Sequence, residues 1–412
     1  MAATCLAAMT ENWPQFRGPT AQGVSGETGV PAQWSESENV VWKTPIPYRG
    51  WSSPIIFGDR VFVTGTSDDG VSCHVVCLDR LGGRILWDTE ALKQRPVGVD
   101  GRNSHASATP VTDGEHVVAF FSSMAAAGLT LDGRVAWTNT DTKFHVVYGP
   151  ASSPVLYKNL VIINCDGTNP STDAGHTAPW DQDYILALDK ATGRVKWKTT
   201  RGSARVAYAT PILVDVGGQP QLISTAGDVV QALNPATGEK LWTVANPGEG
   251  LVPSPVSGDG LLFTTSAFPT EVPGGEAIRA WRLGGDPATS RLVWECKKKM
   301  SHIPSMVYAP GFLFSVTEGG AAMTLKGATG EVAWERALGG AYGASPLYAD
   351  GKVYFLSEQG KTTVVEAAPP FKVIAENRLP GAFKASPAVS HKQIFIRSDS
   401  TLYCIGAKAA AR

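Results

Sequence analysis

The chain has 412 residues, of which 43% are hydrophobic, with 44 Gly, 28 Pro and 12 Trp. Its 36 basic and 37 acidic residues leave a net charge of −1 with no long run of one sign, which excludes the electrostatic footprint of a protein that binds nucleic acid or anionic lipid. No stretch approaches the roughly 18 apolar residues that a transmembrane helix needs. The composition is typical of many short strands joined by turns.

The first 38 residues precede any repeat and are expected to pack as an irregular arm. Their start, MAATCLAAMTENW, is too short for a complete signal peptide with a charged first region. Its small residues fit the end of a removed export signal as well as they fit an ordinary N-terminus. Residues 407–412 are expected to form a C-terminal tail.

From residue 39 onward, a short alternating run that ends near a tryptophan recurs along the chain, as in RILWDT and EVAWER. The turn before it is often written as in ALDKATGRVKW, where Thr can bond nearby backbone and Gly accepts a positive φ. An eighth run, KVIAEN, carries Ala375 in place of the tryptophan and is expected to mark a weaker joint. The seven tryptophans with an expected structural role are Trp42, Trp87, Trp137, Trp197, Trp242, Trp294 and Trp334.

A second marker, Ser or Thr followed by Pro, also recurs once per unit, as in SSPIIF, SATPVT and ASPLYA. A polar turn and alternating β-branched and aromatic residues follow it, which is the pattern of a β-hairpin. Each unit therefore predicts four strands. Units of this kind at a period of about 40–50 residues are typical of a β-propeller.

The two ends of the repeat complement each other. The chain opens with a tryptophan strand, NVVWKTP, and its last unit ends at SDSTLYCIGA with no tryptophan strand after it. The sequence therefore predicts an all-β fold: a single eight-bladed β-propeller over residues 39–406, with four-stranded antiparallel blades. The N-terminal strand would complete the last blade, and such closure hides open sheet edges.

The A-x-D-x-x-T-G-x-x-x-W pattern, from about residue 40 to 405, resembles the pyrroloquinoline-quinone (PQQ) type propeller repeat. The resemblance implies a tryptophan docking motif that locks neighbouring blades. Proteins with this repeat include quinoprotein alcohol and glucose dehydrogenases, the non-catalytic lipoprotein of the bacterial outer-membrane barrel-assembly machinery, and secreted bacterial PQQ-binding-like propellers. The stretch NWPQFRGPTAQGVS is most similar to the last group, so the resemblance implies a periplasmic or secreted bacterial protein.

The resemblance also implies what PQQ catalysis requires. In the alcohol-oxidising relatives the quinone stacks between a Trp and a disulfide of adjacent cysteines, beside a calcium or lanthanide ion held by Glu, Asn and Asp. The chain has no adjacent Cys pair, and no metal set can be assigned residue by residue. We therefore expect no cofactor, and PQQ with calcium or a lanthanide is the alternative.

In a propeller, the residues just before each Ser-Pro marker should surround the mouth of the central channel. Here they are rich in aromatic and hydrogen-bonding groups, which either plug a funnel or form a binding site for a small molecule, a glycan or a protein partner. Glu249 is the only carboxylate among them. The candidate ligand-binding residues are Arg49, Trp51, Asn103, His105, Tyr148, Arg205, Tyr208, Glu249, His302, Tyr342 and Lys384.

Two insertions interrupt the repeat, at residues 165–184 and 266–290. The first contains oxygen ligands at irregular spacing, which either hold calcium or belong to a solvated, turn-rich loop. No metal site is expected, and the weak candidates for one are Asp166, Asp173, Asp181 and Asp183.

Three functions remain open on the sequence alone. The first is a non-catalytic exported scaffold that binds a protein partner or an extracellular polymer. The second is a PQQ-dependent quinoprotein oxidoreductase, and the third is a glycan-binding or glycan-acting propeller that uses the aromatic channel mouth. The first is favoured, because no catalytic residues can be recognised.

Overall fold

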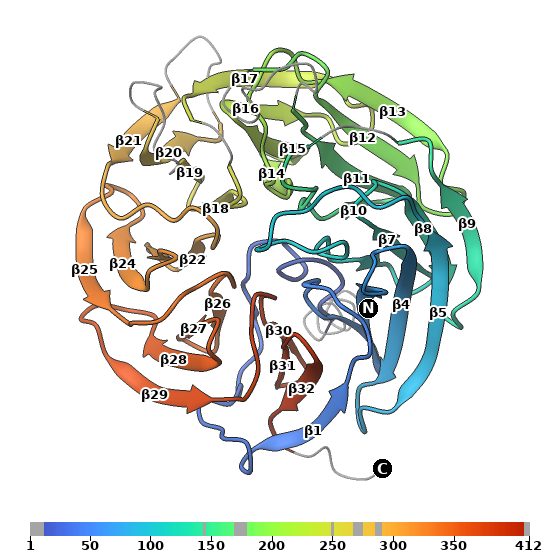
Figure 1. Ribbon diagram of the computed structural model, residues 1–412. Coiled ribbons are helices and arrows are strands. Elements are labelled where there is room, and N and C mark those ends of the chain that lie inside the picture. Colours follow the sequence, from blue (N-terminus) through green and yellow to red (C-terminus); the bar gives the residue numbers. More distant parts are fainter. Residues whose placement is uncertain are drawn as a thin grey trace.

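The computed structural model describes residues 12–142, 146–168, 179–248, 251–266, 275–284 and 291–407. Eight four-stranded antiparallel sheets surround a central axis as the blades of a propeller (Figure 1). The predicted all-β, eight-bladed architecture is confirmed. In the part of the chain that the structure describes, no helix has the length and apolar character needed to cross a membrane.

Each blade runs from a short strand near the axis to a fourth strand at the rim (Figure 1). Blades 1 to 4 consist of β2 (Ile55–Phe57), β3 (Arg60–Thr66), β4 (Ser72–Asp79) and β5 (Ile85–Lys93); β6 (Val111–Thr112), β7 (His116–Phe120), β8 (Ala126–Thr130) and β9 (Val135–Asn139); β10 (Val155–Tyr157), β11 (Leu160–Cys165), β12 (Tyr184–Asp189) and β13 (Val195–Thr200); and β14 (Ile212–Val216), β15 (Gln219–Ala226), β16 (Asp228–Leu233) and β17 (Lys240–Asn246).

Blades 5 to 8 repeat the same order. They consist of β18 (Val256–Gly258), β19 (Leu261–Ser266), β20 (Ala277–Arg282) and β21 (Leu292–Cys296); β22 (Val307–Ala309), β23 (Phe312–Val316), β24 (Ala321–Lys326) and β25 (Val332–Ala337); β26 (Leu347–Ala349), β27 (Lys352–Leu356), β28 (Lys361–Glu366) and β29 (Val373–Arg378); and β30 (Ala388–Ser390), β31 (Gln393–Arg397), β32 (Thr401–Ile405) and β1 (Val40–Pro45).

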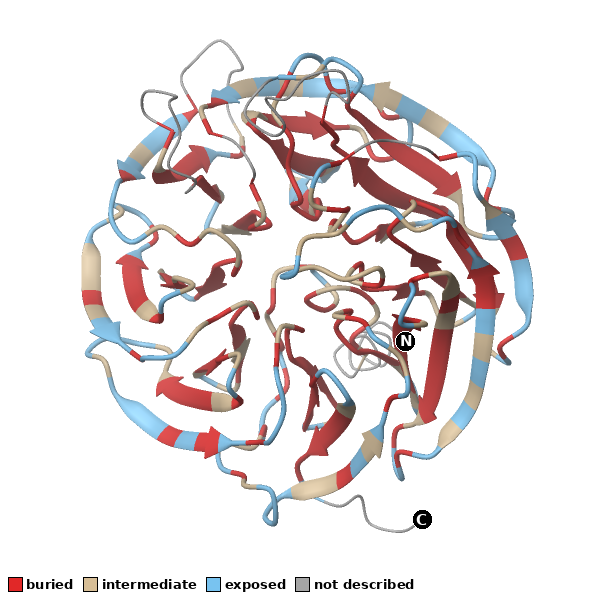
Figure 2. Cartoon of the chain, viewed as in Figure 1, coloured by how far each residue is buried: buried red, intermediate tan, exposed pale blue. Residues whose placement is uncertain are grey.

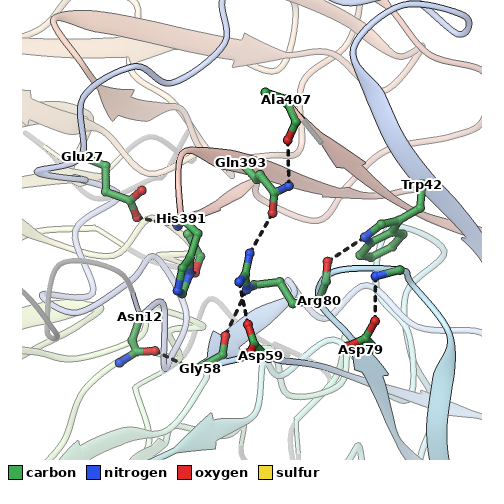
Figure 3. A network of polar contacts seen from close by, with 12 residues as sticks. Asn12, Glu27, Trp42, Gly58, Asp59, Asp79, Arg80, His391, Gln393 and Ala407 are labelled. Atoms are coloured by element: carbon green, nitrogen blue, oxygen red, sulfur yellow. Dashed lines mark hydrogen bonds and ion pairs between the residues drawn. The ribbon is translucent and has the colours of Figure 1, made fainter. Parts of the chain in front are cut away.

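Blade 8 closes the ring as predicted, because β1 pairs antiparallel with β32. Figure 3 shows the joint between this blade and blade 1, which is centred on Arg80. The Arg80 guanidinium donates to Gln393 Oε1 of blade 8 at 3.1 Å and to Asp59 Oδ1 of blade 1 at 2.6 Å. Trp42 Nε1 donates to the Arg80 carbonyl at 2.7 Å. The two ends of the chain are therefore held together by side-chain bonds as well as by the sheet.

Burial follows the position of a strand in its blade. The second and third strands are largely buried between neighbouring blades, whereas the fourth strands alternate mainly between exposed and partly buried residues (Figure 2). In blade 3, for example, every residue of β11 is buried and none of β13 is. Continuous apolar second and third strands therefore form the core, while the alternation of the fourth strand reflects its one solvated face.

Most of the predicted structural tryptophans bridge two blades. Trp87 of blade 1 packs against Gly133 of blade 2, where a Cβ atom would lie 2.7 Å from the indole ring, so this turn position requires Gly. Its Nε1 donates to the Leu131 carbonyl of the same turn at 3.0 Å. Equivalent indole bonds to the turn of the next blade join Trp42 to Arg80, Trp137 to Lys190, Trp197 to Pro235 and Trp294 to Gly327.

Two of the seven tryptophans make different contacts. Trp242 Nε1 donates to Gln221 within its own blade, and the Arg291 guanidinium lies 4.5 Å from its ring. Trp334 packs edge-on against Phe371, and its Nε1 has no hydrogen-bond partner in the described part of the chain. Phe371 lies in the turn between β28 and β29, so Trp334 still connects blades 6 and 7.

The N-terminal arm, residues 12–38, crosses the central region and covers the inner edges of several blades (Figure 1). Its backbone pairs with Ile56 through Trp13 and with Tyr348 through Gly23. The N–H groups of Ile56 and Tyr348, which donate to the arm, belong to the first strands of their blades. These strands have no further strand on their inner side. The arm thus satisfies donors that would otherwise be left unpaired at the channel wall.

The arm also supplies the aromatic ring that blade 7 lacks. Trp34 is only 4% exposed, its ring stacks on Tyr354 of β27 at 6.3 Å, and it belongs to the same apolar cluster as Ala375. Asn377, two residues after Ala375, donates from Nδ2 to the Ala32 carbonyl and accepts the Trp34 N–H. The sequence predicts a weaker joint at Ala375; the structure places Trp34 of the arm in the same cluster, and the strength of this joint stays a prediction.

Candidate functional site

Eight hydroxyl side chains form a closed ring of hydrogen bonds around the channel axis. Each accepts the backbone N–H of the equivalent residue in the preceding blade, at 2.9–3.1 Å. All but one precede a proline, which restricts them to an extended backbone and adds no N–H to the wall. The ring consists of Ser53, Thr109, Ser153, Thr210, Ser254, Ser305, Ser345 and Ser386.

A cavity of about 190 Å³ lies against this ring, and all eight hydroxyl residues line it. The residue two positions before a ring member also lines the cavity in every blade, as for Trp51, Tyr208, Val252 and Ile303. Phe16 of the arm contributes a further aromatic side chain. The cavity therefore combines a hydroxyl-lined surface with an aromatic and aliphatic wall.

Charged side chains mark the open side of the cavity. Arg102 Nε donates to Asp100 Oδ1 at 2.7 Å, and this guanidinium holds the pKa of the Asp100 carboxyl below its usual range. Lys384 Nζ lies 5.3 Å from the centroid of the Trp51 ring and donates to the Gly101 carbonyl at 3.3 Å. Contacts between the loop at residues 94–106 and blade 8 therefore form part of the rim.

Five of the candidate residues predicted from the sequence come together at this cavity: Trp51, Asn103, Tyr148, Tyr208 and Lys384. Asn103 Nδ2 donates to the carbonyls of Tyr148 and Gly149, so it positions the wall rather than offering a free amide. The Tyr208 hydroxyl is buried and donates its proton to no acceptor in the described part of the chain. Burial raises the pKa of Tyr208, so the hydroxyl stays protonated and can act as a donor.

The other candidates do not line the cavity. Arg49 is an exposed residue paired with Asp68 at 2.8 Å. His105 Nδ1 lies 2.8 Å from Ser122 Oγ, and burial lowers the pKa of its imidazole. Arg205 pairs with Asp228, His302 lies beside Glu318, and Tyr342 is buried in a blade core. Glu249 lies outside the described residues.

Several cavity residues were missed by the sequence analysis. The Ser-Pro marker was recognised as a strand start, but its hydroxyl ring requires knowledge of how successive blades are juxtaposed. Asp100 and Arg102 lie in a long connection between β5 and β6, and Glu358 lies in the turn after β27. The only sequence signal for the first two was the length of that connection.

The acidic residues of the first insertion do not come together as free ligands in the described part of the chain. Asp166 is fully buried in a two-bond ion pair with Arg201, at 2.6 and 2.9 Å. Asp183 accepts the Gly167 N–H, and burial, together with the nearby Asp166 charge, raises its pKa to about 8. Asp181 is exposed, and Asp173 lies outside the described residues.

One group of residues in the described ranges has the spacing of metal ligands: Asp113, Glu115 and His116, at the turn between β6 and β7. This turn is not part of the cavity. Lys190 already forms an ion pair with Asp113, so this carboxylate is not a free ligand.

A Ser-His-Asp arrangement is present in blade 1, but its hydrogen bonds do not have the donor and acceptor directions of a catalytic triad. His74 lies 2.9 Å from both Ser72 Oγ and Asp88 Oδ1. However, the Ser72 hydroxyl donates its single proton away from His74, to Glu90 Oε2. A general base needs the opposite direction, and the group is better described as a polar network between β4 and β5.

Comparisons with known structures agree with this architecture. BamB from Moraxella catarrhalis matches with a TM-score of 0.61 and 14% identity over 89% of this chain and 99% of its own. A europium-containing methanol dehydrogenase matches with a TM-score of 0.71 and 10% identity over 97% and 98%. The quinohemoprotein alcohol dehydrogenase ADHIIG from Pseudomonas putida HK5 matches with a TM-score of 0.66 and 13% identity over 100% and 82%. At these identities the likeness is one of fold.

A search of curated protein sequences finds no match. A family model described as outer membrane protein assembly factor BamB matches residues 22–165 and 283–369. The matched segments cover the arm from residue 22, β1, blades 1, 2 and 6, the first two strands of blade 3, β21 of blade 5 and the first three strands of blade 7, and they amount to more than half of the chain. The chain therefore belongs to the family described as outer membrane protein assembly factor BamB.

Proposed function

We propose that this chain is a non-catalytic, exported β-propeller scaffold that binds a protein partner on the face that carries the open side of the cavity. The observation that carries the proposal is that the charged side chains on that face surround an aromatic centre and are largely paired. The most prominent charges at the cavity, Asp100 and Arg102, are paired with each other. Arg102 is exposed and Asp100, Glu358 and Lys384 are partly exposed. Charges of both signs around an aromatic centre are typical of the rim and core of a protein interface.

The family description supports a protein partner and an exported location, because it names an assembly factor of outer membrane proteins. An extracellular polymer as the partner has no separate support. The proposal does not depend on the similarity to the dehydrogenases, which is below 25% in identity and concerns the fold.

PQQ is the alternative, and the described cavity fits it poorly. A volume of about 190 Å³ is below the roughly 300 Å³ at which pockets for larger organic ligands begin. The described lining holds two carboxylates, Glu358 and the already paired Asp100, whereas a divalent or lanthanide ion needs several clustered oxygen ligands. We therefore propose that the protein holds no quinone cofactor and derive no redox step for it.

The experiment is site-specific photo-crosslinking in native cell envelopes. A benzophenone amino acid would replace Lys384 or Arg102 on the proposed face, with Val195 on the rim strand β13, 54% exposed, as the control position. We expect a discrete protein adduct from the first two positions and none from Val195. Purification of the identified partner should in turn recover this protein in the same adduct. Adducts that appear equally at all three positions, or at none, would contradict the proposal.

A further inference from the structure

The hydroxyl ring has a hydrogen-bonding capacity that the fold does not use. Each of the eight oxygens accepts one N–H from its neighbour. In the described part of the chain, none of these hydroxyls donates its own proton to another group. A Ser or Thr hydroxyl has one O–H donor and two lone pairs, so each member keeps one donor and one acceptor position. The cavity is therefore lined by groups that can both donate and accept.

The charges at the cavity favour a neutral ligand. Its described ionisable residues are two acids and two bases: Asp100, Glu358, Arg102 and Lys384. Arg102 is neutralised by Asp100, and the remaining charges, Lys384 and Glu358, have opposite sign, so the net charge of the lining is zero. An anion would require an unpaired cation or several dedicated N–H donors, and the backbone N–H groups of the ring are already bonded to its hydroxyls.

The rest of the wall offers flat and apolar surface. Trp51, Tyr148 and Tyr208 contribute aromatic rings, and Val252 and Ile303 contribute aliphatic groups. The Tyr208 hydroxyl adds another unused donor next to them. A ligand that matches this lining has an apolar face and an edge dense in hydroxyl groups, which is the surface of a pyranose ring.

We propose that the central cavity binds a single neutral pyranose, with its hydroxyl edge on the Ser/Thr ring and one face against the aromatic wall. The cavity of about 190 Å³ is suited to a small ligand of the size of one sugar ring. The source of the ring is either a free sugar or the terminal residue of a glycan. The cavity shares Arg102 and Lys384 with the face proposed above for a protein partner, but the sugar-binding proposal does not require that partner.

The test is isothermal titration of the full-length protein with free hexoses and N-acetylhexosamines and with their methyl glycosides. We expect at least one pyranose to bind with a Kd of about 0.1–10 mM, because a small polar ligand loses much of its hydrogen-bond energy to desolvation. Equal binding of the methyl glycoside identifies a glycan terminus, and binding of the free sugar alone identifies a free monosaccharide. Binding of small carboxylates or phosphate, with no sugar bound, overturns the proposal.

Three variants connect the binding to the cavity. Tyr208→Phe removes a hydroxyl that donates its proton to no acceptor in the described part of the chain, so the protein should stay folded while the Kd rises about fivefold to tenfold. Ile303→Trp fills the cavity and should abolish binding. Tyr157→Phe, on β10 outside the cavity lining, is the matched control and should leave the Kd unchanged. Undiminished binding by Ile303→Trp, or the same Kd for Tyr208→Phe as for the unmodified protein, overturns the proposal.

Discussion

Trp34→Ala tests whether the N-terminal arm completes blade 7. In several blades the fourth-strand tryptophan packs on an aromatic residue of the second strand, as Trp87 does on Phe62 at 5.9 Å. In blade 7 the fourth strand offers Ala375, and Tyr354 of the second strand packs on Trp34 at 6.3 Å instead. Removing the Trp34 ring should therefore leave a cavity between the arm and the blade.

The expected loss can be estimated from the burial of the ring. Trp34 is 4% exposed, and truncation of a buried aromatic side chain to Ala costs about 3–5 kcal/mol. The indole Nε1 has no hydrogen-bond partner in the described part of the chain, so no side-chain bond is lost. The backbone bond from Trp34 to Asn377 remains in the variant. We therefore expect a loss near the lower end, about 3 kcal/mol.

Urea denaturation followed by tryptophan fluorescence and by circular dichroism would measure the free energy of unfolding. A second variant, Trp34→Ala combined with Ala375→Trp, supplies the ring from β29 and should recover part of the loss. A loss below about 1 kcal/mol for Trp34→Ala alone would refute the reasoning. So would a double variant that is as unstable as the sum of the two single changes.

Three further predictions concern the ring, the first insertion and the blade joints. Ser153→Ala removes the acceptor of the buried Thr109 N–H and should lower the free energy of unfolding by about 1–3 kcal/mol, whereas Ser153→Thr should be nearly neutral; equal losses would count against the ring. The pKa of Asp183 is raised from 3.8 to about 8, so the folded protein keeps a proton that the unfolded chain releases, and the free energy of unfolding should fall as the pH rises through this window. In pH-dependent melting, Asp183→Asn should reduce that fall and gain stability at pH 8. An unchanged profile would be inconsistent with a buried, protonated carboxyl. Trp87→Ala should lower the free energy of unfolding by about 3–5 kcal/mol in the same denaturation assay. Leu86→Ala, a change at its exposed neighbour, should lower it by less than about 1 kcal/mol. Similar values for the two variants would argue against docking of Trp87 on the Gly133 turn.

The repeat and its closure were predictable because they depend on local patterns. A polar turn, alternating residues and a terminal tryptophan specify a strand pair wherever they occur. The unmatched strands at the two ends of the chain could therefore be assigned to one blade. β1 indeed pairs with β32, although they are separated by the whole length of the propeller.

The cavity was predictable only in part. Trp51 and Lys384 were found because their positions relative to the Ser-Pro marker fix the direction of the backbone. Arg49 and Tyr342 were placed at the mouth by the same rule, but one pairs with Asp68 and the other turns into a blade core, because side-chain direction depends on neighbours from other blades. The path of the arm follows from unpaired N–H groups at inner strand edges, which exist only once the ring is assembled.

The most direct test of a non-catalytic scaffold is titration of the full-length protein with PQQ in the presence of calcium or a lanthanide. The absorbance spectrum and a dye-linked assay of alcohol and sugar oxidation would be recorded together. We predict no stoichiometric uptake of PQQ and no dye reduction, because the described cavity is small and lacks a cluster of free carboxylates. Stoichiometric PQQ binding with metal-dependent dye reduction that is lost in Trp51→Ala would contradict the account and identify a quinoprotein dehydrogenase.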